Sequence, residues 1–112
     1  MPRRAKPDPL ALAVGKRIRA LREEAELTQE QLAYTSELGS KGHLSNLEKG
    51  LVMPTVATLK AIADRLDMLV ADLVTDPREG DRAKLLELTR GLPAGSLRKL
   101  VKELSAAKKV KK

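Results

Sequence analysis

The stretch TQEQLAYTSELGSKGHLSNLEKG, from Thr28 to Gly50, decides the fold because its pattern is that of two short helices separated by a tight turn. Thr28 is a favoured N-cap residue, and Gln31 three residues later completes a capping box. The first helix is therefore predicted to begin here. Leu32 and Ala33 supply its inward face.

The second helix of this stretch is marked by breaks at both ends. Gly39 interrupts the first helix, Ser40 offers a new N-cap, and Gly50 ends the pattern. Leu44 and Leu47 lie three residues apart and so share one side of the helix. A helix of about ten residues with two large apolar side chains leaves most of its surface for something other than the core.

That surface carries long donors, an amide and small residues, which suit base edges and phosphates in a DNA groove. The alternative is an ordinary solvated polar face. The lone histidine has no second ligand at metal spacing, so neither a metal site nor a catalytic role is predicted for it. The residues in question are Lys41, Gly42, His43, Ser45, Asn46 and Lys49.

From Gly15 to Leu73 the chain resembles the helix-turn-helix domains of phage repressor and Cro proteins, also called the XRE family. GKRIRALREEAELTQEQLA matches the first two helices of that family, LSNLEKG its recognition helix and following turn, and MPTVATLKAIADRL its fourth helix. The resemblance covers about half of the chain and implies an all-α, five-helix domain that binds DNA. One extra residue, placed near 36–38, separates this chain from the common pattern.

The resemblance also implies roles for individual residues. Lys41 and Asn46, with Gly42 and Ser45 beside them, are the expected base readers, since asparagine can bond adenine twice and lysine prefers the acceptors of guanine. Gln29 is expected to reach a phosphate and also to support the recognition helix, the alternative being an exposed glutamine. The expected contacts to the DNA backbone are Arg17, Thr28, Gln29, Ser40, His43 and Lys49.

Arg22 and Glu48 match an arginine and an acid that pair in the family. The resemblance therefore implies a partly buried ion pair between the first and third helices. The cost of desolvating both charges offsets much of their attraction, so such a pair is weak evidence for stability, but it fixes how the two helices sit together.

The remaining helices follow from the apolar pattern. Residues 10–25 are predicted as the first helix, with Val14, Ile18, Leu21 and Ala25 forming its buried stripe. Thr55 is a cap for the fourth helix, and a short helix over residues 68–74 closes the core with Leu69, Val70 and Leu73. The domain is thus predicted to span residues 10–75, after a flexible basic arm at residues 1–9.

Two more helices are predicted in residues 76–107, at about 81–90 and 94–107, followed by a basic tail at 108–112. A helical hairpin cannot enclose its own apolar face, so the stripe must meet the first domain or another chain. SinR-type repressors are similar in length and end in such a hairpin, which favours a homodimer that reads a palindrome. The expected dimerisation residues are Leu85, Leu88, Leu97, Leu100, Val101 and Leu104.

Composition bounds the class of protein. The chain has 112 residues and one aromatic residue, Tyr34, so the core must consist of Leu, Ala, Val and Ile. The absence of cysteine excludes disulfides and thiolate metal sites and fits a reducing cytoplasm, where a DNA-binding protein would associate with the nucleoid. No apolar run is long enough for a signal sequence or membrane span. No cofactor is expected.

The net charge of +7 is unevenly distributed. Residues 1–22 carry seven basic and one acidic group, residues 98–112 carry seven and one, and residues 23–97 carry eight and thirteen. Attraction to phosphate is therefore expected mainly from the first helix and the two ends, while the recognition helix supplies the reading.

The leading hypothesis is a sequence-specific transcriptional regulator, most often a repressor in this bacterial and phage family, that binds double-stranded DNA as a homodimer. A second hypothesis is an antitoxin or adaptor whose hairpin holds a protein partner. An enzyme is the poorest of the three, because the sequence contains no acid pair, nucleophile arrangement or phosphate loop. No small-molecule or membrane partner is indicated.

Overall fold

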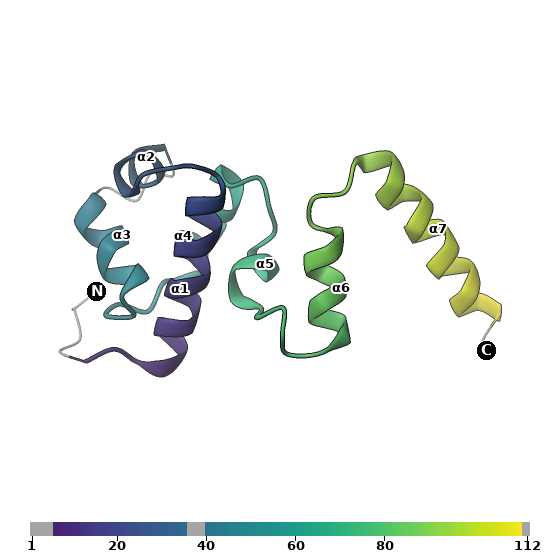
Figure 1. Ribbon diagram of the computed structural model, residues 1–112, viewed down its shortest axis with the longest axis horizontal. Coiled ribbons are helices and arrows are strands. Elements are labelled where there is room, and N and C mark those ends of the chain that lie inside the picture. Colours follow the sequence, from purple (N-terminus) through teal and green to yellow (C-terminus); the bar gives the residue numbers. More distant parts are fainter. Residues whose placement is uncertain (1–5, 36–39, 111–112) are drawn as a thin grey trace. The chain divides into compact units, whose positions relative to one another are not determined.

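The computed structural model describes residues 6–35 and 40–110. Among these residues the only regular secondary structure is helical, which confirms the all-α class (Figure 1). The chain divides into two compact units, Met1–Asp76 and Pro77–Lys112. The segment predicted to hold the extra residue, 36–38, lies outside the described residues, as do 1–5 of the arm and 111–112 of the tail. The helices are α1 (Pro9–Glu24), α2 (Gln29–Thr35), α3 (Lys41–Glu48), α4 (Val56–Arg65), α5 (Val70–Val74), α6 (Asp81–Thr89) and α7 (Ala94–Val110).

Helix α1 begins at Pro9, one residue before the predicted start. Proline lacks an N–H but is well suited to the first helical position, where that group has no partner in the helix. Asp8 is the N-cap, and its carboxylate accepts a hydrogen bond from the Ala11 backbone N–H at 3.0 Å. Pro9, predicted as part of the arm, is therefore the first residue of a capped helix.

Helices α2 and α3 have the predicted caps. The Thr28 hydroxyl accepts from the Gln31 N–H at 3.1 Å, and the Gln31 side chain accepts from the Thr28 N–H at 2.9 Å. Ser40 caps α3 by accepting from the His43 N–H at 3.1 Å. Both helices are too short to be stable alone, so caps and packing must hold them.

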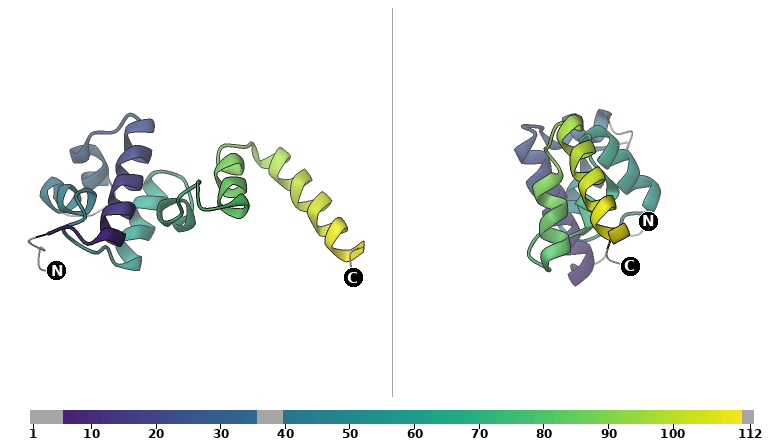
Figure 2. Two further views of the ribbon diagram at one scale, coloured as in Figure 1. Left: turned by 60° about the horizontal axis from the view of Figure 1, so that its bottom comes forward. Right: turned by 90° about the vertical axis from the view of Figure 1, so that its right-hand side faces the viewer.

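The core of the first unit is aliphatic, as the composition requires. Helix α1 packs against α3 and α5, α2 packs against α3 and α4, and α4 packs against α5 (Figure 2). The largest fully buried side chains come from all five helices of this unit. They are Ile18, Leu32, Leu44, Leu47, Ile62 and Leu73.

Two predicted core residues are exposed. Ala25 follows the last residue of α1 as its C-cap, where the helical stripe ends. Leu69 is 63% exposed because it is the N-cap of α5, so its side chain precedes the helical register that buries Leu73. The Leu69 N–H instead donates to the Asp72 carboxylate at 2.9 Å, which holds the start of α5.

Glycines allow α1 to approach the end of α3 closely. A Cβ atom on Gly15 would lie 2.3 Å from the Leu47 carbonyl oxygen, far inside any real contact. Gly50 has φ +75, and a Cβ there would lie 2.6 Å from the Leu12 Cα. Its carbonyl also accepts from the Asp8 N–H at 3.1 Å. The backbone of α1 therefore lies directly against the last turn of α3.

The second unit consists of α6 and α7. Helix α7 ends at Val110, three residues beyond the predicted end, so part of the predicted tail is helical. Within the described residues, no helix of either unit is long and apolar enough to cross a membrane. Several apolar side chains of the unit are exposed, namely Leu85, Leu88, Leu92, Val101 and Leu104.

Candidate nucleic-acid interface

Helix α3 has one buried face and one accessible face. Leu44, Leu47 and Glu48 are buried, and they lie on the side that packs against α1 and α2. Ser45 and Asn46 are half-buried on the opposite side. Lys41, Gly42 and Lys49 are exposed, and His43 is half-buried. By helical geometry Gly42 and Asn46 lie on the side of α3 away from Leu44 and Leu47, Ser45 lies at the edge of that side, and Lys41 is exposed at the first residue of the helix.

The buried face of α3 is held by an ion pair to α1. Arg22 Nε donates to Glu48 Oε2 at 2.7 Å and Arg22 Nη2 donates to Glu48 Oε1 at 3.1 Å, a two-point arrangement. The two residues are only 8% and 6% exposed, respectively. Arg22 Nη1 also donates to the Leu27 carbonyl oxygen at 2.7 Å, which ties in the α1 to α2 connection. The interaction implied by the resemblance is present and nearly fully buried.

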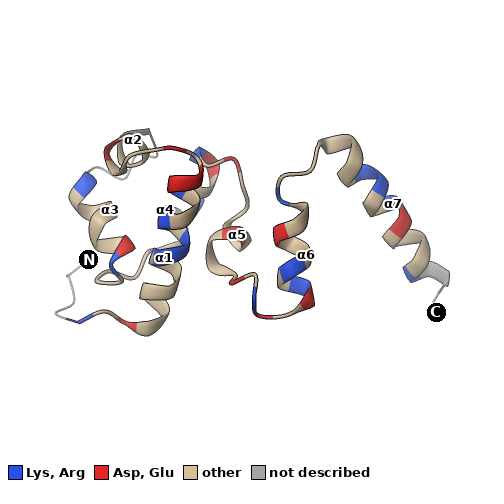
Figure 3. Cartoon of the chain, viewed as in Figure 1, with Lys and Arg blue, Asp and Glu red and all other residues tan. Residues whose placement is uncertain are grey.

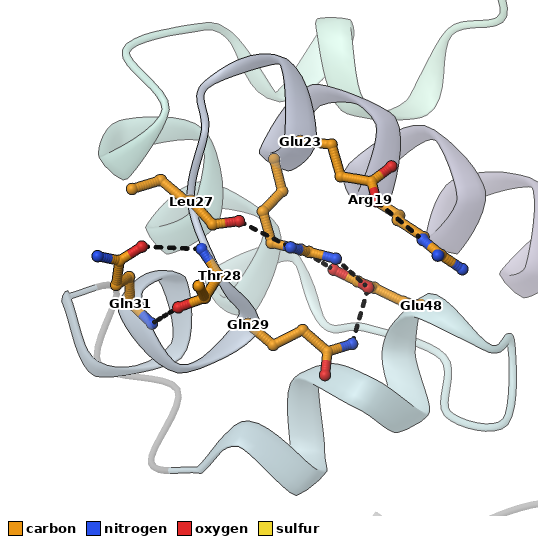
Figure 4. Close-up of polar contacts among 8 residues, drawn as sticks. Arg19, Glu23, Leu27, Thr28, Gln29, Gln31 and Glu48 are labelled. Carbon is orange, nitrogen blue, oxygen red and sulfur yellow. Dashed lines mark hydrogen bonds and ion pairs between the residues drawn. The ribbon is translucent and has the colours of Figure 1, made fainter.

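Gln29 joins the same network (Figure 4). Its side-chain Nε2 donates to Glu48 Oε1 at 2.9 Å, while its amide oxygen points away from Glu48. Glu48 thus accepts three hydrogen bonds from two helices. Of the two roles predicted for Gln29, support of the recognition helix is the one for which the structure supplies a contact.

Lys41 lies at the start of α3 beside an acid of α2. Its Nζ is 3.5 Å from Glu30 Oε1, and both side chains are more than half exposed. An exposed pair of this kind contributes at most about 1 kcal/mol and breaks readily. Lys41 is therefore available to another anion at small cost.

Arg17 lies half-buried on α1, where its Nε donates to the Asp72 carbonyl oxygen at 2.9 Å. This bond links α1 to α5. The remaining predicted backbone residues, Thr28, Ser40, His43 and Lys49, lie at the ends of α2 or on α3.

Gly15 was not singled out by sequence reasoning, although it sets the position of α3. The signal was a glycine directly after Val14 in a stripe of otherwise large side chains. A helix-interior glycine costs stability, so its presence indicates close packing of a second backbone. Asp72 was missed as well, and its signal was an acid three residues after Leu69, the N-cap of α5.

Two capped helices, the second fixed by a buried ion pair and presenting polar residues outward, define a helix-turn-helix domain. The chain belongs to the helix-turn-helix family, whose model matches residues 13–74. The similarity to phage repressors predicted from the sequence is confirmed. The immunity repressor protein of Bacillus phage phi105 is 40% identical over 63 residues, which are 56% of this chain and 43% of the repressor.

Further relatives extend the same similarity. The uncharacterised regulator y4dJ of Sinorhizobium fredii is 41% identical over 66 residues, 59% of this chain and 84% of that protein. The restriction-modification controller C.AhdI of Aeromonas hydrophila has a TM-score of 0.54 at 28% identity, covering 56% of this chain and 94% of the controller. A chain of the SinR–SinI complex has a TM-score of 0.60 at 25% identity, covering 86% of this chain and 98% of that chain.

Proposed function

We propose that the protein is a sequence-specific DNA-binding transcriptional regulator that acts as a repressor. The observation that carries the proposal is that α3 has two different sides. One side is buried and held by the bonds of Glu48, and the other is polar and accessible. Glu48 is fixed by Arg22 and Gln29 on one side, so the other side is presented in a constant orientation. An α-helix of this kind fits the major groove. The proposal assigns no residue a catalytic role and places the protein in the cytoplasm with the nucleoid.

In the proposed complex, Lys41 and Asn46 read base edges. Gly42 lets α3 approach the bases closely, and Ser45 makes secondary contacts. The backbone of the duplex is held by the N-terminal ends of α2 and α3, whose N–H groups and partial positive charge favour phosphates. Side chains that add to this grip are Arg17, Thr28, Gln29, Ser40, His43 and Lys49.

We further propose that the protein acts as a homodimer on a palindromic operator. Exposed leucines and valines in α6 and α7 would be covered by the same helices of a second copy, which favours this arrangement. A dimer would then place two copies of α3 about 34 Å apart, one turn of the duplex. The predicted contacts are Leu85, Leu88, Leu97, Leu100, Val101 and Leu104.

A protein partner at the second unit is the other candidate. It is favoured by one observation: the similar SinR chain, which matches 86% of this protein, is described in a complex with a second protein, SinI. On this hypothesis the apolar face of α6 and α7 would bind a different chain, and DNA binding would serve regulation of that pair.

The test is selection of bound duplexes from a random pool at near-physiological salt, with the mass of free and bound protein measured in parallel. A palindromic motif bound by two chains is the expected result. No enriched motif would contradict the proposed sequence-specific function. A palindrome bound by one chain would contradict the homodimer alone.

Asn46→Ala is expected to weaken binding to the selected site by about 1–3 kcal/mol, because one two-point contact to a base is lost. Binding to random duplexes should be nearly unchanged, and Asn46 is accessible enough for the fold to survive. Titration of both duplexes under identical salt measures the difference. An equal loss on random DNA would rule out base reading by Asn46.

A further inference from the structure

The two units differ sharply in charge. Met1–Asp76 contains eleven basic and eleven acidic residues and is neutral, while Pro77–Lys112 contains eleven basic and four acidic residues, a net charge of +7. The entire net charge of the protein therefore belongs to the unit that does not contain the recognition helix. Affinity for duplex DNA depends largely on cations that neutralise phosphates. The helix-turn-helix unit has no excess of them.

Many cations of the first unit are also engaged within the unit. Arg22 is buried against Glu48. Exposed pairs are formed by Arg19 with Glu23 at 3.5 Å, by Lys41 with Glu30 at 3.5 Å and by Lys60 with Asp64 at 2.9 Å. These exposed pairs break at small cost, but each cation must give up an internal contact before it reaches a phosphate.

Three cations of α7, in contrast, form no polar contact within the described part of the chain. Arg98, Lys99 and Lys102 are exposed, and in the described part of the chain no hydrogen bond or ion pair engages them. Glu103 is the single acid in Ala94–Val110. Figure 3 shows basic residues recurring along α7. These side chains are available to an external anion without loss of an internal contact.

Helical geometry separates these cations from the apolar residues of α7. At about 100° per residue, Arg98 and Lys102 point to nearly the same direction, and Lys99 lies next to them. The apolar stripe occupies the opposite half of the helix and consists of Leu97, Leu100, Val101 and Leu104. A partner that covers the stripe would therefore leave the basic face, defined here as Arg98, Lys99 and Lys102, open to solvent.

We propose that the basic face of α7 binds the phosphate backbone of duplex DNA that flanks the site read by α3. The inference rests on the proposed function, because it requires that α3 hold the protein on DNA. Once α3 is bound, the linked α7 is confined near the duplex, so each weak phosphate contact acts at high local concentration. The second unit then supplies affinity without sequence preference, and the neutral first unit supplies selection.

An anionic membrane surface is the competing partner for a basic amphipathic helix, but α7 fits it poorly. Helices that lie in the membrane interface combine basic residues with Trp, Phe and Leu on the apolar face. The only aromatic residue of this chain is Tyr34, on α2, so α7 has no aromatic anchor. The stripe is also short, with four large apolar residues.

The test uses the full chain carrying Arg98→Gln and Lys102→Gln, and a matched control carrying Arg82→Gln and Lys84→Gln. Both pairs are exposed helical cations, and both variants lose two charges. The measurement is the slope of log affinity against log salt on the selected duplex with about ten base pairs of flank on each side. The α7 variant should lower the magnitude of the slope by about 2, since each phosphate contact contributes about 0.9. The control should change it by less than half of that.

Three results would overturn the inference. They are an unchanged slope in the α7 variant, an equal change in both variants, and tighter binding of wild-type protein to phosphatidylglycerol vesicles than to DNA with loss of vesicle binding in the α7 variant. Circular dichroism and mass of both variants show whether fold and assembly are retained. The two failures are distinguishable. Failure of the inference appears as an unchanged salt slope, which can be measured on a random duplex as well, whereas failure of the proposed function appears as an absent preference for any site.

Discussion

Glu48→Ala is expected to lower the free energy of unfolding by about 3–5 kcal/mol, because it leaves the buried charge of Arg22 without its partner. Arg22 would keep its bond to the Leu27 carbonyl but lose both bonds to the carboxylate. Gln29 would lose its acceptor as well. Urea unfolding followed by circular dichroism gives the change from the transition midpoint at constant slope.

The matched control is Glu23→Ala, which removes the same side chain from an exposed pair. Arg19 and Glu23 lie 3.5 Å apart with more than half of each side chain exposed, so the cost should stay within about 1 kcal/mol. A loss of similar size in both variants would show that burial of Arg22 and Glu48 is energetically irrelevant.

Replacing both partners distinguishes stability from positioning. The double variant Arg22→Met, Glu48→Leu leaves neither charge of the pair buried. Its free energy of unfolding should therefore be well above that of Glu48→Ala. If the pair serves to orient α3, the double variant should nevertheless bind the selected DNA site more weakly than wild type. If a stable double variant binds the selected site with wild-type affinity, the pair is not needed to orient α3 for DNA binding.

The parts of the fold that were predictable from sequence are those governed by local chemistry. Thr28, Ser40 and Thr55 cap their helices because short polar side chains can reach the free N–H groups of the first turn. The stripe of Leu44 and Leu47 gave the inward face of α3 because helical periodicity alone determines it. These features need no knowledge of the rest of the chain.

The parts that were missed depend on packing between distant segments. Leu69 is a large apolar residue of the kind usually buried in a core, but it is exposed because it lies at the N-cap of α5. The closeness of Gly15 to Leu47 follows from the angle at which α1 meets α3, and periodicity does not give that angle. For the candidate site, sequence and family resemblance indicated the polar residues of α3. The contacts of Gln29 with Glu48 and of Lys41 with Glu30 depend on how α2 packs against α3, which no local pattern determines.

Gly15→Ala is expected to destabilise the protein by about 1–3 kcal/mol and to disturb α3 beyond that cost. The new Cβ would lie 2.3 Å from the Leu47 carbonyl oxygen and 2.7 Å from that of Glu48, and backbone atoms cannot rotate away as a side chain can. Alanine gains up to about 1 kcal/mol of helix propensity over glycine, which opposes part of the strain. The measurements are urea unfolding and titration of the selected duplex.

The control is Gly95→Ala, at a helical glycine of α7 where the added Cβ would meet no described atom within 4 Å beyond its chain neighbours and its own helix backbone. It isolates the gain in propensity, so it should be neutral or slightly stabilising and leave DNA affinity unchanged. Gly15→Ala moves the last turn of α3 away from α1, and its loss of site preference should persist under conditions where the variant is fully folded. A folded Gly15→Ala protein with wild-type preference would mean that close packing of α1 on α3 does not set the orientation of the reading face.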